Sequence, residues 1–376
     1  MNSPVSFSRC STYEQESIAA AFGEAMAQLG GMGAFVKQGQ RILIKPNLLS
    51  DHPPEDAVTT HPEVVRAVIR SVKAAGGIPV VGDSSASAID LKRVWTKTGM
   101  EAVCHEEGVE LVVFEGEGGR TVTRDGFTFT LSHILKDVDG VISVCKVKSH
   151  VLMTLTAGVK NLYGFIPGYQ KATLHKEIPS PSDFGRLLRV LAEEVKPMLT
   201  IADGVVGMEG EGPSGGSPVH LGFLGASADP FALDLALCDV LRIPRKSVPY
   251  LRECLNESVS CKGVAIEELH PAHFRIPSTF KMRMIPRRLA KWVGFLVWIR
   301  PSFDGATCIR CGRCVKACPV HVLELAAGSK KGDVPHLKQP RKCIGCCCCH
   351  EVCPVKAIEM RQSWVLRVAR VYRNKK

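Results

Sequence analysis

The sequence lacks the features that direct a chain into or across a membrane. Its first residues, MNSPVSFSRCSTYEQES, have no charged start followed by an apolar stretch, so we expect no secretory signal peptide. The apolar run of residues 292–299 is eight residues long, whereas a helix needs about 20 residues to span a bilayer. We therefore expect a cytoplasmic protein, with peripheral contact at the inner membrane face as the alternative for this segment.

Nucleotide-binding motifs are also missing. The chain has no Walker or dinucleotide fingerprint and no flavin, haem or nicotinamide motif. No nucleic-acid-binding motif is present, so we expect no nucleic-acid partner. The composition, with 45% hydrophobic residues and 34 glycines, is that of a globular protein. The length of 376 residues predicts roughly two or three domains.

Acidic residues are absent from two stretches near the C-terminus. Residues 275–303 contain seven Lys or Arg and residues 361–376 contain six, so the net charge of +11 is concentrated there. We interpret residues 271–304 as a basic, Trp-containing connector that packs on the C-terminal domain, or alternatively lies in a membrane interface. Residues 361–376 form a basic tail. Positive surfaces of this kind suit an acidic electron-transfer partner of the flavodoxin or ferredoxin type.

Cysteine, by contrast, is abundant, and half of the 16 cysteines follow one repeated spacing. CIRCGRCVKACP and CIGCCCCHEVCP both read Cys-x2-Cys-x2-Cys-x3-Cys-Pro, the bacterial ferredoxin arrangement. The sequence therefore predicts a small ferredoxin-like α+β domain over residues 305–360 that binds two 4Fe-4S clusters. Its resemblance to two-cluster ferredoxins implies the following ligands: Cys308, Cys311, Cys314 and Cys353 for cluster 1, and Cys343, Cys346, Cys349 and Cys318 for cluster 2.

Two other chemistries would use clustered cysteines. A disulfide framework needs an oxidising compartment, and structural zinc usually repeats pairs of cysteines, so both are weaker alternatives. Cys347 and Cys348 lie outside the repeated spacing. We interpret them as buried or spare thiols. The alternative interpretation is a redox role or a role as alternative cluster ligands. The remaining six cysteines are scattered singly and are typical of small core residues.

The first 245 residues alternate between strand and helix patterns. Apolar segments such as RILIKPNLL, IPVVGDSS, DGVISVCKVKSH and MLTIADGVVG predict strands, and HPEVVRAVIRSVKAAGG, residues 184–195 and residues 230–241 predict helices. This alternation predicts an α/β domain over residues 1–270, with a mostly parallel sheet and flanking helices. Ligands of such sheets bind at the carboxyl ends of the strands.

Polar residues gather at those strand ends. Lys45 and Asn47 follow the first predicted strand, and Asp203 lies in a later one. In KVKSH, the residues Lys146, Lys148 and His150 recur with a period of two and should face one side of a strand. Because neighbouring positive groups repel unless an anion or a carboxylate meets them, we infer that an anionic ligand binds here.

Two glycine-rich segments follow. TAGVKNLYGFIPGYQKATLH is expected to form a loop that presents Lys160, Asn161, Lys171 and His175, and DGVVGMEGEGPSGG adds Glu209. The plainer alternative for the first segment is a solvated surface loop. Loops of this length inside a compact domain are often functional, which favours a binding role.

Together, the segments KPNLL, HPEVVRAVI, GDSS, KVKSHVLMTLTAGVKNLYGFIPGYQKATLH, ADGVVGMEGEGPSGG and SADPFALDLAL resemble the domain of unknown function 362 family, whose members often carry a C-terminal two-cluster ferredoxin unit. The resemblance spans almost the whole chain. It implies an α/β fold, iron-sulfur binding and a polar site built from His150, Lys160, Asn161 and His175. It leaves the reaction open.

Three functions are compatible with these patterns. The first is an iron-sulfur oxidoreductase that relays electrons through two 4Fe-4S clusters to an anionic substrate or cofactor in the α/β domain. The second is a ferredoxin-like electron carrier or adaptor without chemistry of its own. The third is a racemase- or isomerase-type enzyme acting on a hydroxy acid. For the first, we predict His150, His175 and Lys160 as catalytic residues, and as substrate-binding residues Lys45, Asn47, Lys146, Lys148, Asn161, Lys171, Asp203 and Glu209.

Overall fold

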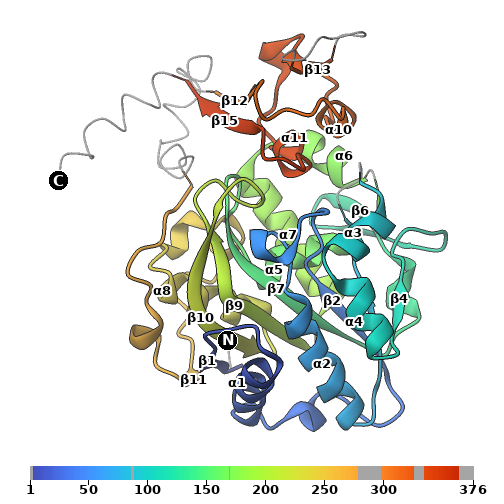
Figure 1. Cartoon of the computed structure of the whole chain (residues 1–376), viewed down its shortest axis with the longest axis vertical. Coiled ribbons are helices and arrows are strands. Elements are labelled where there is room, and N and C mark those ends of the chain that lie inside the picture. Colours follow the sequence, from blue (N-terminus) through green and yellow to red (C-terminus); the bar gives the residue numbers. More distant parts are fainter. Residues whose placement is uncertain (1–2, 86–88, 169, 278–297, 326–333, 364–376) are drawn as a thin grey trace.

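A large mixed sheet forms the centre of the molecule (Figure 1). The computed structural model describes residues 3–85, 89–168, 170–277, 298–325 and 334–363. These residues form a nine-stranded sheet in the order β11-β1-β10-β9-β7-β2-β3-β4, with β8 paired to β7. The strands are β1 (Val5–Arg9), β2 (Arg41–Pro46), β3 (Ile78–Gly82), β4 (Glu110–Val112), β7 (Gly140–His150), β8 (Thr154–Thr156), β9 (Leu199–Glu209), β10 (Ser217–Ser227) and β11 (Cys261–Gly263).

Helices cover both faces of this sheet. Alternate residues of β2 divide the core, because Ile42 and Ile44 pack with one set of helices and Leu43 packs on the opposite face. The first face carries α1 (Gln15–Ala27), α2 (Pro62–Ala74), α3 (Leu91–Lys97) and α4 (Met100–Glu106). The other carries α5 (Gly158–Asn161), α7 (Pro181–Val195) and α8 (Pro230–Val240). A separate hairpin joins β5 (Arg120–Arg124) to β6 (Phe127–Leu131).

The predicted fold class is confirmed. Strands β9, β7, β2, β3 and β4 run parallel, as the alternating pattern predicts, whereas β10 is antiparallel to both β9 and β1. The expected loop over residues 156–175 is wrong in detail, since this segment forms α5 and α6 (Gln170–Glu177) joined by a 3-10 turn. A carboxylate from a distant segment stabilises the start of α5. Asp234 accepts hydrogen bonds from the backbone N–H groups of Gly158 and Val159.

The C-terminal unit is small and has two similar halves. The strands β12 (Ile299–Phe303) and β15 (Ile358–Gln362) pair antiparallel, as do β13 (Leu323–Glu324) and β14 (His336–Leu337). The short helices α10 (Arg313–Lys316) and α11 (Cys348–Glu351) each lie inside one of the cysteine motifs. In Figure 1 the unit sits over the end of the α/β domain that carries α6.

Polar contacts dock this unit on the α/β domain. Asp51, whose side chain is 1% exposed, pairs with Arg313 at 2.7 Å and also with Arg93. Lys356 pairs with Asp56 at 3.0 Å at a more exposed position. The contacts join the cysteine-motif segments directly to the loop that follows β2, so the position of the unit is fixed relative to that loop.

Most of the two basic segments lies outside the described residues. This applies to residues 278–297 of the predicted connector and to residues 364–376 of the predicted tail. Among the helices that the structure describes, none has the length and apolar character that crossing a membrane requires.

Candidate functional site

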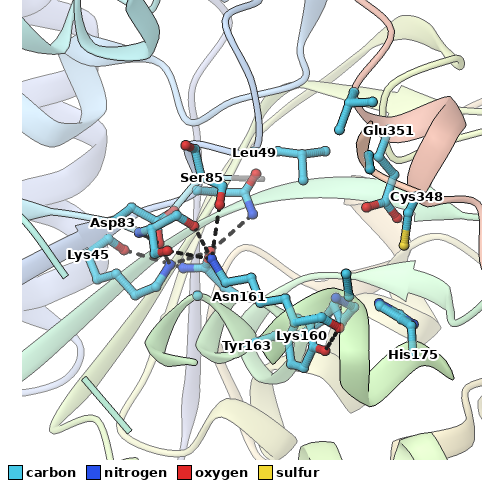
Figure 2. A pocket seen from close by; sticks show the side chains of 17 residues that line it. Lys45, Leu49, Asp83, Ser85, Lys160, Asn161, Tyr163, His175, Cys348 and Glu351 are labelled. Carbon is cyan, nitrogen blue, oxygen red and sulfur yellow. Dashed lines mark hydrogen bonds and ion pairs between the residues drawn. The ribbon is translucent and has the colours of Figure 1, made fainter. Parts of the chain in front are cut away.

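A cavity of about 90 Å³, lined by both polar and apolar side chains, lies between the α/β domain and the C-terminal unit (Figure 2). The ends of β2 and β3 contribute Lys45, Asn47, Asp83 and the two serines that follow. From α5 and α6 come Lys160, Asn161, Lys171 and His175. The C-terminal unit closes the cavity with Ala317, Cys348, Glu351 and Val352. The site therefore forms where parallel strands end, as expected for this class of sheet.

Lys45 and Asn161 form the rigid floor of the cavity. The Lys45 Nζ atom lies 2.7 Å from Asp83 Oδ1 and donates to Asn161 Oδ1 at 3.2 Å. Burial lowers the pKa of Lys45, and the Asp83 carboxylate opposes that shift. A Cβ atom on Gly164 would lie 2.7 Å from Lys45 Nζ. Glycine is therefore required for the turn after α5 to approach this ion pair.

Lys148 lies behind this floor and reaches the cavity through Asn47. Its Nζ donates to Asn47 Oδ1 at 3.0 Å and to the Val58 carbonyl at 2.6 Å. Asn47 in turn donates from Nδ2 to Asn161 Oδ1 at 3.1 Å. Burial lowers the pKa of Lys148 to about 7. Lys148 therefore positions Asn47 and does not line the cavity.

The lowered pKa of Lys148 predicts that the free energy of unfolding depends on pH. In the unfolded chain Lys148 holds its proton up to about pH 10.5, whereas the folded protein releases it near pH 7. The unfolded state thus binds more protons between these values, and stability should rise with pH by up to about 1.4 kcal/mol per unit. The free energy of unfolding of wild type relative to Lys148→Met should increase from pH 7 to pH 10. A difference that is flat over this range would contradict the assignment.

Lys171 anchors α6 to the segment after β3. Its Nζ atom donates to the Ser84 carbonyl at 2.5 Å, the Ser84 hydroxyl at 2.7 Å and the Ser85 carbonyl at 3.1 Å. Burial lowers the pKa of Lys171 to about 8. Three oxygen acceptors match the three N–H groups of an ammonium, so the protein itself satisfies Lys171.

Lys160 is held differently. Its Nζ atom lies 4.3 Å from the ring centroid of Tyr163 and 5.9 Å from that of Phe184. Within the described part of the chain, this ammonium makes no hydrogen bond and no ion pair. Burial lowers its pKa, and the more distant carboxyl of Glu351 opposes the shift.

His175 lies beside Lys160 and is 5% exposed. Its ring stacks on Phe184 with centroids 4.3 Å apart. Burial first, and then the Lys160 charge, lower the pKa of His175 to about 3. The imidazole is therefore neutral at physiological pH.

His150 does not line the cavity. Its Nδ1 atom accepts hydrogen bonds from the backbone N–H groups of Leu152 at 3.0 Å and Met153 at 3.2 Å. The ring proton is therefore on Nε2, which lies 3.7 Å from Glu351 Oε1. Glu351 belongs to the cavity wall, so His150 contacts the site from behind this carboxyl group.

Three predicted substrate-binding residues lie elsewhere. Lys146 and Asp203 form a buried ion pair of 2.6 Å, and the Tyr13 hydroxyl accepts from Lys146 and donates to Asp203, at 2.9 Å in both cases. The carboxylate that meets Lys146 is thus part of the protein, and no ligand is needed there. Glu209 pairs with Arg275 at 2.7 Å near the surface.

The cysteines of the two motifs surround two further cavities in the C-terminal unit. One is lined by Cys308, Cys311, Cys314 and Cys353, and the other by Cys318, Cys343, Cys346 and Cys349 together with Cys347. Each holds about 20 Å³, and the remaining walls are mostly apolar. Among the described residues, no three His, Cys, Asp or Glu side chains are placed to hold a single metal ion. Four thiols around a small void suit an iron-sulfur cluster.

The cysteine cavities and the interdomain cavity are adjacent. Ala317, Cys348 and Val352 line the interdomain cavity, and each directly precedes a predicted cluster ligand, namely Cys318, Cys349 and Cys353. The two cysteines outside the repeated spacing line different cavities. Cys347 lines a cysteine cavity, and Cys348 lines the interdomain cavity. Ala317 belongs to the first cysteine motif, and Cys348 and Val352 belong to the second.

Several cavity residues were not among the predicted site residues. Tyr163 lies in the same segment as Lys160, and Ser85 follows Asp83 at a strand end, so position in the sequence could have indicated both. Cys348 and Glu351 carry no such signal. Their spacing indicates only that they lie beside cluster ligands, and their place in the cavity depends on how the C-terminal unit docks.

Two family models match the two parts of this architecture. The family model "Domain of unknown function (DUF362)" matches residues 42–239, and a 4Fe-4S dicluster domain matches residues 302–360. The thylakoid-associated protein sll1697 of Synechocystis sp. is 40% identical over 248 residues, which are 65% of this chain and 76% of that protein. The lactate racemase apoprotein of Thermoanaerobacterium thermosaccharolyticum gives a TM-score of 0.43 at 14% identity, over 65% of this chain and 58% of that one, less than two thirds of its length.

Proposed function

This chain belongs to the family of the domain of unknown function DUF362 and carries a 4Fe-4S dicluster domain, and from these facts we propose that it is an iron-sulfur oxidoreductase. In this proposal, electrons pass through two 4Fe-4S clusters to an anionic substrate or cofactor in the interdomain cavity. One observation carries the proposal: the wall of that cavity is built from the chain neighbours of cluster ligands, Ala317, Cys348 and Val352.

The proposed ligand sets are the two groups of four cysteines that surround the cysteine cavities. A 4Fe-4S cluster, when bound, supplies electrons one at a time. Reduction of a carbonyl or a carbon–carbon double bond consumes two electrons and two protons. We propose that a reduced acidic protein of the flavodoxin or ferredoxin type supplies the electrons, as its charge complements the basic segments of the chain.

The residues of the chain have distinct proposed tasks in this cavity. Lys160 binds the anionic group through Nζ, and its lowered pKa makes that proton easier to give to the substrate. His175 donates a hydrogen bond from its neutral ring. Lys45, Asn47 and Asn161 hold the floor in one geometry through their mutual hydrogen bonds. The C-terminal unit covers the site and limits access of water.

Single-turnover reoxidation tests this function. Protein purified without oxygen would be reduced with dithionite, freed of excess reductant and mixed with 2-oxo acids and 2-enoates bearing one or two carboxylates. We expect at least one acid to reoxidise the clusters, with two electrons consumed per molecule of product. Lys160→Met should slow this reoxidation by at least about 10-fold at unchanged iron content. Lys176→Met, on the exposed side of the same helix as His175, should leave the rate unchanged.

Other outcomes would favour the other functions. Clusters that stay reduced with every acid, yet exchange electrons with an acidic redox protein in a salt-sensitive reaction, would support an electron carrier or adaptor. Conversion of a hydroxy acid by protein with fully oxidised clusters would support a racemase or isomerase. Either result would overturn the proposed oxidoreductase.

The proposed location is the cytoplasm, with peripheral contact at the inner face of a membrane as its refinement. The basic, Trp-containing segment motivates the contact, and the thylakoid association of the Synechocystis relative supports it. Sedimentation of the protein with anionic vesicles, compared with neutral ones, tests this contact.

A further inference from the structure

Of the cavity's three lysines, only one is available to a ligand from outside the protein. Lys45 is paired with Asp83, and Lys171 donates to three oxygens of the segment after β3. Lys160 faces aromatic rings, and within the described residues it has no hydrogen-bond acceptor. Lys160 is only partly buried, and its ammonium has no acceptor among the described residues, so the negative group of a ligand that enters the cavity can pair with it.

We propose that the cavity binds a small monocarboxylate, with one oxygen on Lys160 Nζ and the other on the ring N–H of His175. This inference deepens the proposed function, on which it rests for the location of the site. His175 is 5% exposed, lines the cavity and, among the described residues, has no hydrogen-bond partner on its ring. Two separate donors on one wall match the two oxygens of a carboxylate.

The rest of the cavity argues against a second negative charge. The wall opposite Lys160 is formed by Cys348 and Glu351, neither of which is a cation (Figure 2). A dicarboxylate or a phosphate dianion would therefore carry a charge that the described residues leave without a partner. The charges that line the cavity therefore favour a carboxylate with a single charge over phosphate, although Lys160 alone would attract either.

The body of the ligand should be short and partly apolar. Leu49, Ala172, Ala317 and Val352 contribute the apolar part of the lining, and the volume of about 90 Å³ admits only a small molecule. Stacking on Phe184 fixes the plane of His175, so the donor direction is set before the ligand enters. The predicted class is thus an acid with one carboxylate and a few carbon atoms.

Isothermal calorimetry on the oxidised holoprotein tests the inference without any electron transfer. The probes are propionate, its neutral isostere propionamide, succinate and inorganic phosphate. We expect propionate to bind at least about 10-fold more tightly than each of the other three. Lys160→Met should weaken propionate binding by about 10- to 100-fold. His175→Phe, which keeps the stacked ring but removes its N–H group, should weaken it by about 5- to 10-fold.

Lys176→Met is the matched control, because it removes an exposed lysine of the same helix and should leave propionate binding unchanged. Equal affinity for propionate and propionamide would overturn the inference, as would tighter binding of succinate or phosphate. With any of these binding results, the proposed electron relay would still be supported if another acceptor reoxidises the clusters in a single turnover. Selective propionate binding in a protein whose clusters are never reoxidised would instead uphold the inference and refute the relay.

Discussion

Replacing Cys346 with Ser is expected to lower the iron content of the anaerobically purified protein from about eight to about four atoms per chain. Cys346 lines the second cysteine cavity together with Cys318, Cys343 and Cys349. Because a serine hydroxyl is a poorer ligand for iron than a thiolate, one cluster should be lost or strongly destabilised. Iron and acid-labile sulfide analysis, with electron paramagnetic resonance of the reduced protein, measures the change.

Cys347→Ser is the matched control for this prediction, because it changes the next residue in the same chemical way. Cys347 also lies in the wall of the second cavity, but its thiol donates to the Gly345 carbonyl at 3.4 Å. The repeated spacing assigns it no iron, and the variant should retain both clusters. Loss of iron in Cys347→Ser, with retention in Cys346→Ser, would mean that the ligand assignment is shifted by one residue.

Removing the carboxylate of Asp51 should release the C-terminal unit from the α/β domain. The side chain of Asp51 is 1% exposed and accepts two hydrogen bonds from Arg313, whose side chain is 16% exposed. Breaking a buried pair of this kind costs about 3 kcal/mol, because the remaining charge is left without its partner. In Asp51→Ala, hydrogen exchange of the backbone in α11 should therefore become about 100-fold faster.

The second interdomain pair provides the control. Lys356 and Asp56 are about one-third exposed, so water screens their attraction and the pair contributes about 1 kcal/mol or less. Asp56→Asn should accelerate the same exchange by less than about 10-fold. If Asp51→Ala were as mild as Asp56→Asn at unchanged cluster content, Asp51 would not be the main contact that docks the unit.

The sequence predicts those parts of the site that depend on local spacing. The two cysteine motifs group in space as the ferredoxin resemblance implies, since each set of four lines one cavity. Lys45 and Asn47 reach the cavity because parallel strands end on one edge of a sheet. Both patterns extend over only a few residues, so they can be recognised in the sequence.

The remaining features depend on contacts between distant segments. The pairing of Lys146 with Asp203 joins β7 to β9, and no local pattern distinguishes this internal carboxylate from a ligand. Cys348 enters the interdomain cavity only because Asp51 fixes the C-terminal unit above the strand ends. The segment of residues 156–175 is rich in glycine, yet its capping carboxylate, Asp234, lies about 75 residues away in the chain.

Pulsed electron paramagnetic resonance with carbon-13 in the ligand would show whether the bound acid lies next to a cluster. The dithionite-reduced protein would be saturated with propionate labelled at the carboxyl carbon, at a concentration set by calorimetry. We expect a hyperfine coupling between a reduced cluster and the labelled carbon, and we expect this coupling to disappear in Lys160→Met. Reduced clusters with bound propionate and no coupling would contradict it, because the acid would then lie away from the wall that carries the cluster ligands.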